Sequence, residues 1–521
     1  MANSLSRIEH IVHLMLENRS FDQMLGFLYT DDGNRSPTGQ PFDGLTGNES
    51  NPDDLGRPVG VYRIRATDPH PYLMPGADPG EGFQNTNYQL FCDDHPAPGA
   101  VPTNQGFVVN FKSAIATDQS RHDKDALPGT TPEQIMGMYT PELLPVLSGL
   151  AKGYAVCDRW FASAPTMTMP NRAFALAATS QGHLDDHVKI FTCPSIFGRL
   201  SDQGVDWAIF GYNRDPLTRH DFPDTQNADD SHFGHFRDFQ ARAASGTLPA
   251  FTFLEPSWDA SGNSQHPNYD VAAGEQLIHD VYYALRNGPG WNSTLFIVTY
   301  DEHGGNYDHV APPSGATPPG DGTVGEFGFD FTRFGVRVPA VLVSPLIAAG
   351  TVFRSAAGTI DHTSVLKTIG ERFGTAPLTA RDRAADGARP RRAVARRRAH
   401  AREPARRERR SARRRDRTRV ARVPSERGDA VEARQAPGGP HRGTAAAQRE
   451  GLLRGGRHAA RIERRTVELH SGPRRRVEPA SPAATATAAA TATTTAAEQA
   501  APLKHPGGDA RGPFSTHADA R

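Results

Sequence analysis

Six short apolar runs, separated by turn residues, constrain the fold of this chain more than any other feature of its sequence. Runs of this length with few charges are typical of strands buried on both faces of a parallel sheet. They lie at residues 8–16, 155–162, 207–212, 250–254, 294–300 and 336–343.

Helical spacing of apolar residues follows several of these runs, at residues 141–152, 270–285 and 361–372, and Asp361 is the predicted N-cap of the last helix. Strands that alternate with helices indicate parallel βαβ units. We therefore predict an α/β fold with a mostly parallel central sheet. The stretch from Thr30 to about Pro132 is rich in Gly, Pro, Asn and Asp, and we expect an extended loop region there, with at most a small hairpin.

The chain has two parts of opposite charge, although its 58 basic and 58 acidic side chains cancel overall. Residues 381–521 hold about 34 basic against about 15 acidic side chains, and Phe514 is their single aromatic residue. Apolar residues are too sparse there to bury a core, so we expect a disordered Arg/Ala-rich tail. Residues 1–380 are predicted to form one globular domain.

The basic segment has two interpretations. An Arg-rich segment can bind nucleic acid or an acidic surface, with an affinity that falls steeply with salt. Arg with almost no Lys, together with Ala, Gly and Pro, is also what a GC-rich gene gives when it is translated out of frame. We favour a frameshift near residues 381–386 over a genuine basic tail.

Several classes of protein are disfavoured by composition. No stretch approaches the roughly 20 apolar residues that span a bilayer. The first ten residues show no signal peptide, so a cytoplasmic location is the default expectation, and export stays open as the alternative. Cys92, Cys157 and Cys193 are widely spaced and form neither a disulfide framework nor a CxxC metal motif.

The first polar cluster, Glu17 and Asn18, directly follows the run at 8–16. Ligands bind at the carboxyl ends of strands in open α/β sheets. A carboxylate beside a carboxamide offers two hard oxygen ligands to a cation. Ser20 and Gln23 fit a capping box for a following helix. The alternative is that Glu17 and Asn18 only cap a turn.

The second cluster places Thr166 and Thr168 between the run at 155–162 and a short helical segment, with Pro170 near the helix start. A hydroxyl just before a helix N-terminus suits phosphate. Such a hydroxyl becomes a nucleophile when a metal ion activates it. The alternative is an ordinary helix cap.

The third cluster follows the run at 294–300 and contains Asp301, Glu302, His303 and His309 around a Gly-Gly pair. Adjacent carboxylates repel each other unless a cation or a shared proton offsets their charge. This cluster is therefore the strongest candidate for a functional site.

His266 precedes the helical segment at 270–285. An imidazole there can donate to a phosphate oxygen or protonate a leaving alkoxide. The alternative is a surface loop histidine.

Taken together and in order, these segments resemble the phosphoesterase family of bacteria and plants that includes non-specific phospholipase C and a related acid phosphatase. The resemblance covers about residues 5–382 and rests on long, ordered motifs. The motifs are ENRSFDQMLG, DRWFASAPTMTMPNR, SQHPNYDVAAGE, TLFIVTYDEHGGNYDHVAPP, FGVRVPAVLVSP and DHTSVLKTIGERFG.

The resemblance implies an alkaline-phosphatase-like three-layer sandwich and a set of catalytic residues. Thr168 matches the family's nucleophile, His266 matches the histidine that contacts the phosphoryl group, and His303 lies in the same signature. The residues that match the family's cation-holding positions are Glu17, Asn18, Asp301 and Glu302. Oxygen ligands of this kind favour Ca²⁺, Mg²⁺ or Mn²⁺.

We therefore expect residues 1–380 to be a catalytic domain that hydrolyses phosphate esters. The favoured activity is phospholipase C-type cleavage of glycerophospholipids through a phosphothreonine intermediate, and the alternative is an acid phosphatase acting on monoesters. Phospholipid or another phosphate ester is the expected partner, with peripheral membrane contact; nucleic acid is disfavoured. From other classes, a nucleic-acid-binding protein that uses the basic tail and an inactive truncated product remain open.

Overall fold

Eight strands form the central sheet, in the order β13-β6-β12-β11-β1-β10-β8-β9. The computed structural model describes residues 4–121, 126–258, 261–355 and 358–388. Neighbouring strands are parallel, except that β12 is antiparallel to both β11 and β6. The bounds of these strands are β1 His10–Leu16, β6 Ala155–Cys157, β8 Trp207–Gly211, β9 Phe233–His235, β10 Phe251–Glu255, β11 Thr294–Tyr300, β12 Ala340–Val343 and β13 Thr351–Phe353.

Three two-stranded sheets lie outside the central sheet. They pair β2 Ser50–Pro52 with β3 Pro58–Gly60, β4 Tyr62–Arg63 with β5 Gly137–Met138, and β7 Trp160–Phe161 with β14 Ile360–Asp361.

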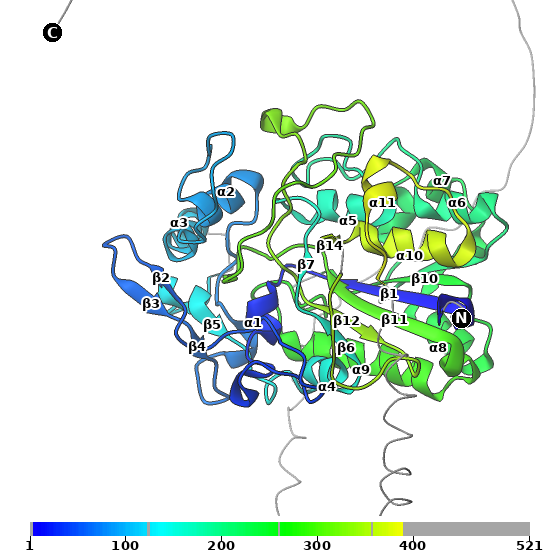
Figure 1. Cartoon of the computed structure of the whole chain (residues 1–521), viewed down its shortest axis with the longest axis horizontal. Helices are drawn as coiled ribbons and strands as arrows, with labels where there is room; N and C mark the ends of the chain where they lie inside the picture. Colours follow the sequence, from blue (N-terminus) through cyan, green and yellow to red (C-terminus); the bar gives the residue numbers. More distant parts are fainter. Residues whose placement is uncertain (1–3, 122–125, 259–260, 356–357, 389–521) are drawn as a thin grey trace, which may run out of the picture. The chain divides into compact units, whose positions relative to one another are not determined.

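Helices cover both faces of the central sheet, so the molecule has three layers (Figure 1). In the view of Figure 1, α5, α6, α10 and α11 lie above the sheet, and α4, α8 and α9 lie below it. None of the described helices combines the length and apolar character needed to cross a membrane. The α-helices are α1 Phe21–Leu25, α2 Phe83–Phe91, α3 Phe107–Arg121, α4 Pro145–Gly153, α5 Thr168–Ala177, α6 Ile196–Asp202, α7 Pro223–Gln226, α8 Phe236–Ser245, α9 Val271–Asn287, α10 Thr363–Phe373 and α11 Ala380–Ala384. The 3-10 helices are η1 Ser4–Arg7, η2 Thr30–Asp32, η3 Pro71–Leu73, η4 Pro132–Met136, η5 Leu217–His220, η6 Asp230–His232, η7 Pro289–Ser293 and η8 Glu326–Gly328.

The prediction of an α/β fold with a mostly parallel central sheet is confirmed. All seven residues of β11 are buried, as expected for an apolar strand covered on both faces. Two of the six predicted strands differ from the prediction by more than two residues. The run at 155–162 divides into β6 and β7, which join different sheets. The run at 336–343 contributes only β12, because Pro339 has no N–H to donate to a sheet.

The predicted helix starts are confirmed at Ser20 and near residue 270. Ser20 Oγ accepts the N–H of Gln23 at 3.2 Å and caps α1. Asp270 caps α9 by accepting the N–H of Ala272 at 2.8 Å. The helix predicted from residue 141 begins only at Pro145, as α4. The N-cap position of α10 is His362 and not Asp361, but Asp361 Oδ1 supplies the capping oxygen, because it accepts the N–H of Thr363 at 3.2 Å.

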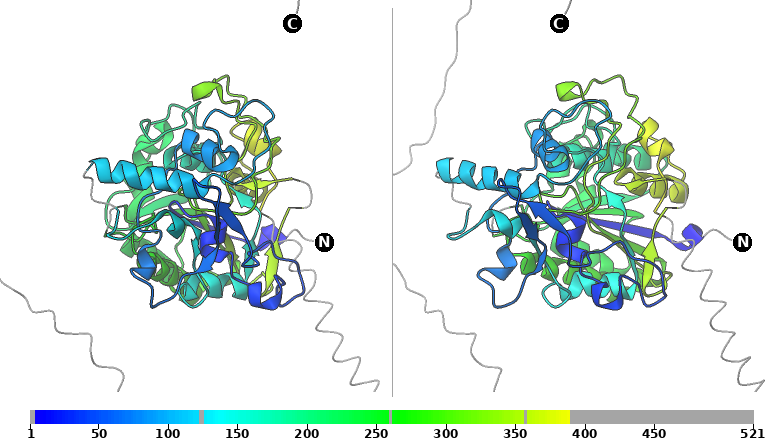
Figure 2. Two further views of the ribbon diagram at one scale, coloured as in Figure 1. Left: turned by 90° about the vertical axis from the view of Figure 1, so that its left-hand side faces the viewer. Right: turned by 60° about the vertical axis from the view of Figure 1, so that its left-hand side comes forward.

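The region from Thr30 to Pro132 is more regular than predicted. The expected hairpin is present as β2–β3, but α2 and α3 are helices that we interpreted as loop. Figure 2 shows α3, in light blue, extending away from the sheet. The sequence of α2, FQNTNYQLF, is rich in Asn and Gln and lacks clean apolar spacing, which is why its pattern was missed.

The ordered contacts continue past the boundary that we predicted at residue 380. Arg381 in α11 is buried, and its Nε and Nη2 donate to Asp361 Oδ2 at 3.0 and 2.9 Å. Ala388 is buried as well, and its N–H donates to Thr368 Oγ1 at 2.8 Å. Residues 389–521 lie outside the described part of the chain. The disordered tail and the frameshift therefore stay predictions.

Candidate functional site

Four of the expected site residues lie at the carboxyl ends of two neighbouring strands. β1 and β11 are parallel and paired over seven residues, so the residues that follow them meet at one edge of the sheet. The backbone N–H of Asn18 donates to Asp301 Oδ1 at 3.0 Å. Glu17 and Glu302 adjoin this contact, and both are buried.

Thr168 lies at the same place, at the first position of α5. Its hydroxyl donates to Asn18 Oδ1 at 3.1 Å, and the residue is 5% exposed. The next N–H of the helix, that of Met169, is held by Asp186 Oδ1 at 2.7 Å. The hydroxyl therefore stands at a helix N-terminus, where the helix dipole favours an anion.

Asn171 fixes the turn that presents Thr168. Its Nδ2 donates to the carbonyl oxygens of Ala164, Thr166 and Met167 at 3.1, 2.8 and 3.1 Å. Its Oδ1 accepts the N–H of Ala164 at 3.0 Å. One buried carboxamide thus satisfies the backbone of a turn that has no strand or helix partners of its own.

Arg172, one residue further along α5, orients Asp301. Arg172 Nε donates to Asp301 Oδ2 at 3.0 Å, and both residues are buried. Arg172 Nη2 also donates to the carbonyl oxygen of Met15 at 3.1 Å. The guanidinium therefore ties α5, the end of β1 and the end of β11 together.

Glu17 and Glu302 are buried carboxyl groups of this site that each lack a partner for one oxygen within the described part of the chain. Burial raises the pKa of Glu17, and burial followed by the charges of Glu81 and Asp301 raises the pKa of Glu302 well above its ordinary value. Among the described residues, Glu17 Oε2 and Glu302 Oε1 have no hydrogen-bond partner. Buried carboxylate oxygens of this kind require a proton or a cation, so the donor set fits a hard divalent cation.

The Gly-Gly pair after His303 lets the loop after β11 approach the backbone of Asn18 and of Gly80. Gly304 has a φ of +59°, and a Cβ there would lie 2.1 Å from the carbonyl oxygen of Asn18. Gly305 has a φ of +65°, and a Cβ there would lie 2.5 Å from the carbonyl oxygen of Gly80. Only glycine satisfies both the backbone conformation and the space.

His266 lies beside two acidic residues, Asp78 and Glu81. One ligand atom from each of the three lies within 4.8 Å of the others. Burial alone would lower the pKa of His266, but the charges of Asp78, Glu17 and Glu81 outweigh it and raise the pKa to about 9. Asn18 Nδ2 donates to Glu81 Oε2, which joins this group to the Thr168 side of the site. The acidic surroundings of His266 therefore favour its protonated form.

His303 is placed behind the site. It is 1% exposed, Nδ1 lies 3.2 Å from Glu302 Oε2, and Nε2 lies 2.7 Å from Gln89 Oε1. Its ring also packs edge-on against Phe107. Both ring nitrogens therefore have protein partners, one of them a residue of the expected cation site. The expected catalytic role of His303 stays a prediction.

Sequence reasoning missed three acidic residues and undervalued one arginine of this site. Asp78 and Glu81 lie in a Gly- and Pro-rich stretch that we interpreted as loop, and Asp186 lies in a second one; neither stretch carries a periodic signal. Arg172 was visible only as part of the Pro-Asn-Arg motif after Thr168.

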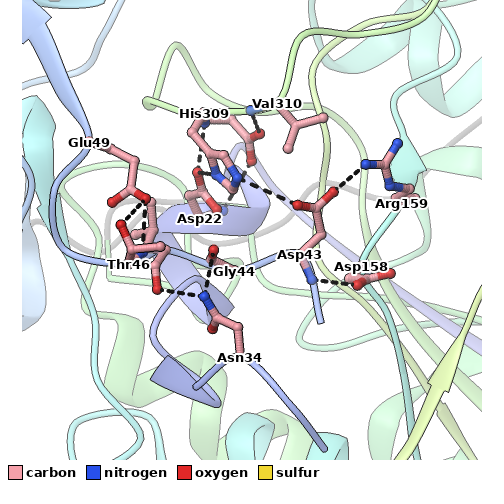
Figure 3. Close-up of polar contacts among 12 residues, drawn as sticks. Asp22, Asn34, Asp43, Gly44, Thr46, Glu49, Asp158, Arg159, His309 and Val310 are labelled. Atoms are coloured by element: carbon pink, nitrogen blue, oxygen red, sulfur yellow. Dashed lines mark hydrogen bonds and ion pairs between the residues drawn. The ribbon is translucent and has the colours of Figure 1, made fainter. Parts of the chain in front are cut away.

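Asp308 and His309 follow Asp301 in the chain, but they belong to a second cluster of charged residues. Arg337 is fully buried, and it donates through Nε to Asp308 Oδ1 and through Nη2 to Asp22 Oδ1, both at 2.9 Å. His309 Nδ1 lies 2.6 Å from Asp22 Oδ2, and its Nε2 lies 3.7 Å from Asp43 Oδ1 (Figure 3).

This second cluster is structural. The acidic residues could hold a metal by spacing alone, but the Arg337 guanidinium already supplies the positive charge between them. Burial would lower the pKa of His309, yet the charge of Asp22 and hydrogen bonds to Asp22 and Asp43 raise it to about 10. The cluster fastens α1 to the loop after β11.

The large hollow of about 860 Å³ on the surface of the described part lies elsewhere, between β4, η3 and η4. Its lining includes Tyr62, Arg65, Tyr72 and Glu142 and none of the expected site residues. The candidate site is thus defined by converging polar groups and not by cavity size.

Comparison with known proteins gives one family and several relatives. The profile of the Phosphoesterase family matches residues 8–376. "Non-specific phospholipase C6" of Arabidopsis thaliana is 37% identical over 396 residues, which cover 72% of this chain and 70% of that protein. "Phospholipase C B" of Mycobacterium tuberculosis is 30% identical over 425 residues, which cover 71% of this chain and 74% of that protein. The family match spans every expected site residue.

Solved structures with a similar arrangement are much more distant. A protein in the alkaline phosphatase superfamily from Vibrio parahaemolyticus is 13% identical, with a TM-score of 0.31 over 49% of this chain and 66% of that chain. A phosphonate monoester hydrolase of Agrobacterium radiobacter is 14% identical, with a TM-score of 0.27 over 47% of this chain and 71% of that chain.

Proposed function

We propose that this chain, which belongs to the Phosphoesterase family and is a phosphoric ester hydrolase, cleaves glycerophospholipids as a phospholipase C, with Thr168 as its nucleophile. The observation that carries the proposal is the 3.1 Å contact between the Thr168 hydroxyl and Asn18 Oδ1, beside buried carboxylates. The phospholipase C names of relatives at 30–37% identity support the substrate class.

The reaction needs an aligned nucleophile and stabilisation of charge on the phosphoryl oxygens. In the proposed mechanism the Thr168 hydroxyl gives its proton to a buried carboxylate of the site as its oxygen attacks phosphorus in line. The bond from phosphorus to the diacylglycerol oxygen breaks, that oxygen takes the proton of His266, and a phosphothreonine ester that still carries the head group is left. Water then gives a proton to His266 and attacks phosphorus, which releases the phosphorylated head group, and Thr168 regains its proton from the carboxylate. The N-terminus of α5 favours negative charge at the position of attack.

His266 supplies the proton for the departing alcohol. The charges of Asp78, Glu17 and Glu81 raise its pKa to about 9, which favours the protonated ring. An alkoxide is a poor leaving group, and a positioned acid that protonates it contributes about 100-fold or more to such reactions.

Glu17, Asn18, Asp301 and Glu302 are the residues that would hold a divalent cation, of which Ca²⁺, Mg²⁺ and Mn²⁺ fit oxygen donors. When bound, such an ion neutralises phosphate charge and lowers the pKa of the threonine hydroxyl. Arg172 keeps Asp301 in its orientation through the contact at 3.0 Å.

The test is a paired assay on the purified full chain. The proposal expects release of diacylglycerol and phosphocholine from phosphatidylcholine, at a higher kcat/KM than for hydrolysis of p-nitrophenyl phosphate. Rapid hydrolysis of the monoester with no release of diacylglycerol would instead identify an acid phosphatase. Loss of phosphatidylcholine hydrolysis in Thr168→Ala, with an unchanged melting temperature, would tie the activity to this site.

A further inference from the structure

Exposed apolar side chains gather on two segments that adjoin the candidate site. Val324 is 85% exposed and Phe327 is 63% exposed, and both lie in the loop at residues 320–331 that contains η8. Ile190 is 61% exposed and lies in the segment at residues 183–192. Isolated exposed apolar residues are ordinary on a protein surface and do not indicate a binding surface by themselves. The position of these residues relative to the candidate site is therefore the evidence to consider.

The base of the 320–331 loop is packed onto the elements that carry the site. Phe329 and Phe331 are buried in one apolar cluster with Phe83 and Phe174. Phe83 begins α2, two residues after Glu81, and Phe174 lies in α5, the helix that begins with Thr168. The loop is therefore held in a fixed place next to the site.

The 183–192 segment links this loop to the nucleophile. Glu326 accepts the N–H of Leu184 at 2.9 Å, and its other oxygen lies 3.1 Å from His183 Nδ1. Two residues further on, Asp186 holds the N–H of Met169 at 2.7 Å. These hydrogen bonds connect the loop, through the 183–192 segment, to the helix start where Thr168 lies.

The acidic groups of the loop have partners within the protein. Glu326 is engaged by the contacts above, Asp321 accepts from Thr179 and Thr323, and Asp330 accepts from Thr332. Phe327 stacks on Phe83 at 5.8 Å between ring centroids, with an interplanar angle of 6°. The tip consequently presents apolar side chains on a polar, hydrogen-bonded base. Figures 1 and 2 show the lime-green loop projecting from the body in all three views.

We propose that the tip of the 320–331 loop inserts into the surface of a phospholipid aggregate, with Val324 and Phe327 as the inserted side chains. This inference rests on the phospholipase function proposed above. A phospholipid in a bilayer presents its phosphate at the depth of the head groups, whereas Thr168 is nearly buried. A protein that cleaves this phosphate has to seat its site against the lipid surface.

A lipid surface suits these side chains for a physical reason. Transfer of an exposed Phe or Val side chain out of water is favourable in proportion to the apolar area that is buried. Shallow insertion of such residues beside polar groups is how proteins bind at a bilayer interface without spanning it. The charged carboxylates of Asp321 and Asp330 limit the insertion to the tip of the loop.

The test compares Val324→Ser/Phe327→Ser with a matched control, Leu55→Ser/Tyr283→Ser. The control also removes two exposed apolar side chains, 70% and 47% exposed. Leu55 lies between β2 and β3, and Tyr283 lies on α9, which covers the opposite face of the sheet from α5 (Figure 1). Vesicles of pure phosphatidylcholine are used with the full chain, because the Arg-rich residues 389–521 would bind anionic lipid. Two readouts are needed: sedimentation with the vesicles, and hydrolysis of vesicles against hydrolysis of a short-chain phosphatidylcholine kept monomeric.

The proposal expects the loop variant to lose vesicle binding and vesicle hydrolysis by at least about tenfold, with hydrolysis of the monomeric lipid and the melting temperature unchanged. The control variant keeps both activities. Equal loss on the two substrates would overturn the proposal, because the loop would then support the site itself. Unchanged vesicle binding would overturn it as well.

Failure of the proposed function gives a different result. If the wild-type chain hydrolyses neither lipid, the phospholipase assignment fails. Sedimentation with vesicles then still tests whether the 320–331 loop binds lipid. Binding by the wild-type chain that the loop variant lacks supports the proposal, and equal or absent binding contradicts it.

Discussion

The hydroxyl of Thr168 lies 3.1 Å from the carboxamide oxygen of Asn18, although 150 residues separate them in the chain. The contact joins the start of α5 to the end of β1. Through the backbone of Asn18 it continues to Asp301 at the end of β11. Three segments that are distant in sequence therefore converge on one group of polar atoms, and the predictions below address that convergence.

A side chain at position 304 should disrupt the site, because Gly304 lies close to the backbone of Asn18. In Gly304→Ala the new Cβ would lie 2.1 Å from the carbonyl oxygen of Asn18, at a φ of +59°. A displacement of about 1 Å costs about a hundredfold in rate, so we expect kcat to fall by that order. Gly315→Ala is the matched control, because Gly315 has a φ of +86° with no atom within 4 Å. It should cost about 1–2 kcal/mol of stability, because an L residue is strained at this φ, and leave kcat unchanged. Equal kcat values in the two variants would refute the close-approach argument.

Arg172 should matter for activity beyond its effect on stability. Arg172→Met leaves the buried Asp301 without its ion pair, which costs about 3–5 kcal/mol of unfolding free energy for such pairs. The control is Arg354→Met, since Arg354 Nη2 pairs with the buried Asp158 at 2.5 Å. Urea unfolding should show both variants destabilised, whereas kcat per folded molecule should fall only in Arg172→Met. An unchanged kcat there would remove Arg172 from the site.

The His309 cluster should make stability depend on pH. Its folded-state pKa is raised from 6.5 to about 10, so its contribution is fully present below about pH 6.5 and is lost as pH rises through 10. The groups that face it are Asp22, Asp43, Asp308 and Arg337. We expect the unfolding free energy to fall by on the order of 4 kcal/mol between pH 6.5 and 10.

The measurement is urea unfolding of the wild-type chain and of His309→Gln across this pH range. The glutamine variant should be less stable at pH 6.5 and show a flatter pH dependence. The same slope in both proteins would show that another group titrates there.

A divalent cation should stabilise the chain through Glu17 and Glu302. After treatment with a chelator, addition of Ca²⁺, Mg²⁺ or Mn²⁺ at about 100 times its Kd should stabilise the fold by about 2.7 kcal/mol, seen as a higher melting temperature. The double variant Glu17→Gln/Glu302→Gln should lose this increase. Asp308→Asn is the control and should keep it, because Arg337 already neutralises the second cluster. No increase in the wild-type chain with any of the three ions would contradict the assignment.

The sheet and the site differ in how far the sequence predicted them. β1, β8, β10 and β11 follow from mainly apolar runs, because a strand covered on both faces buries nearly all of its side chains. Because ligands bind at the carboxyl ends of such strands, the runs also predict that Glu17, Asn18, Asp301 and Glu302 lie at one edge of the sheet.

The remaining site residues depend on tertiary contacts that leave no local pattern. Asp78 and Glu81 reach His266 from a stretch whose composition is that of a loop, and their role depends on where that loop packs. His303 contacts Gln89 and Phe107 as well as Glu302, and no local pattern in the sequence indicates these partners. Arg381 likewise shows why composition placed the domain boundary too early: it is an arginine in an Arg-rich segment, but it is buried against Asp361.

The central claim is that Thr168 forms a covalent bond to phosphorus, and mass spectrometry of the acid-quenched enzyme tests it most directly. During turnover of phosphatidylcholine, the peptide that contains Thr168 should carry a phosphocholine adduct on the threonine oxygen, and the adduct should be absent from Thr168→Ala. An adduct on another residue would contradict the account, as would Thr168→Ala that turns over at the wild-type rate.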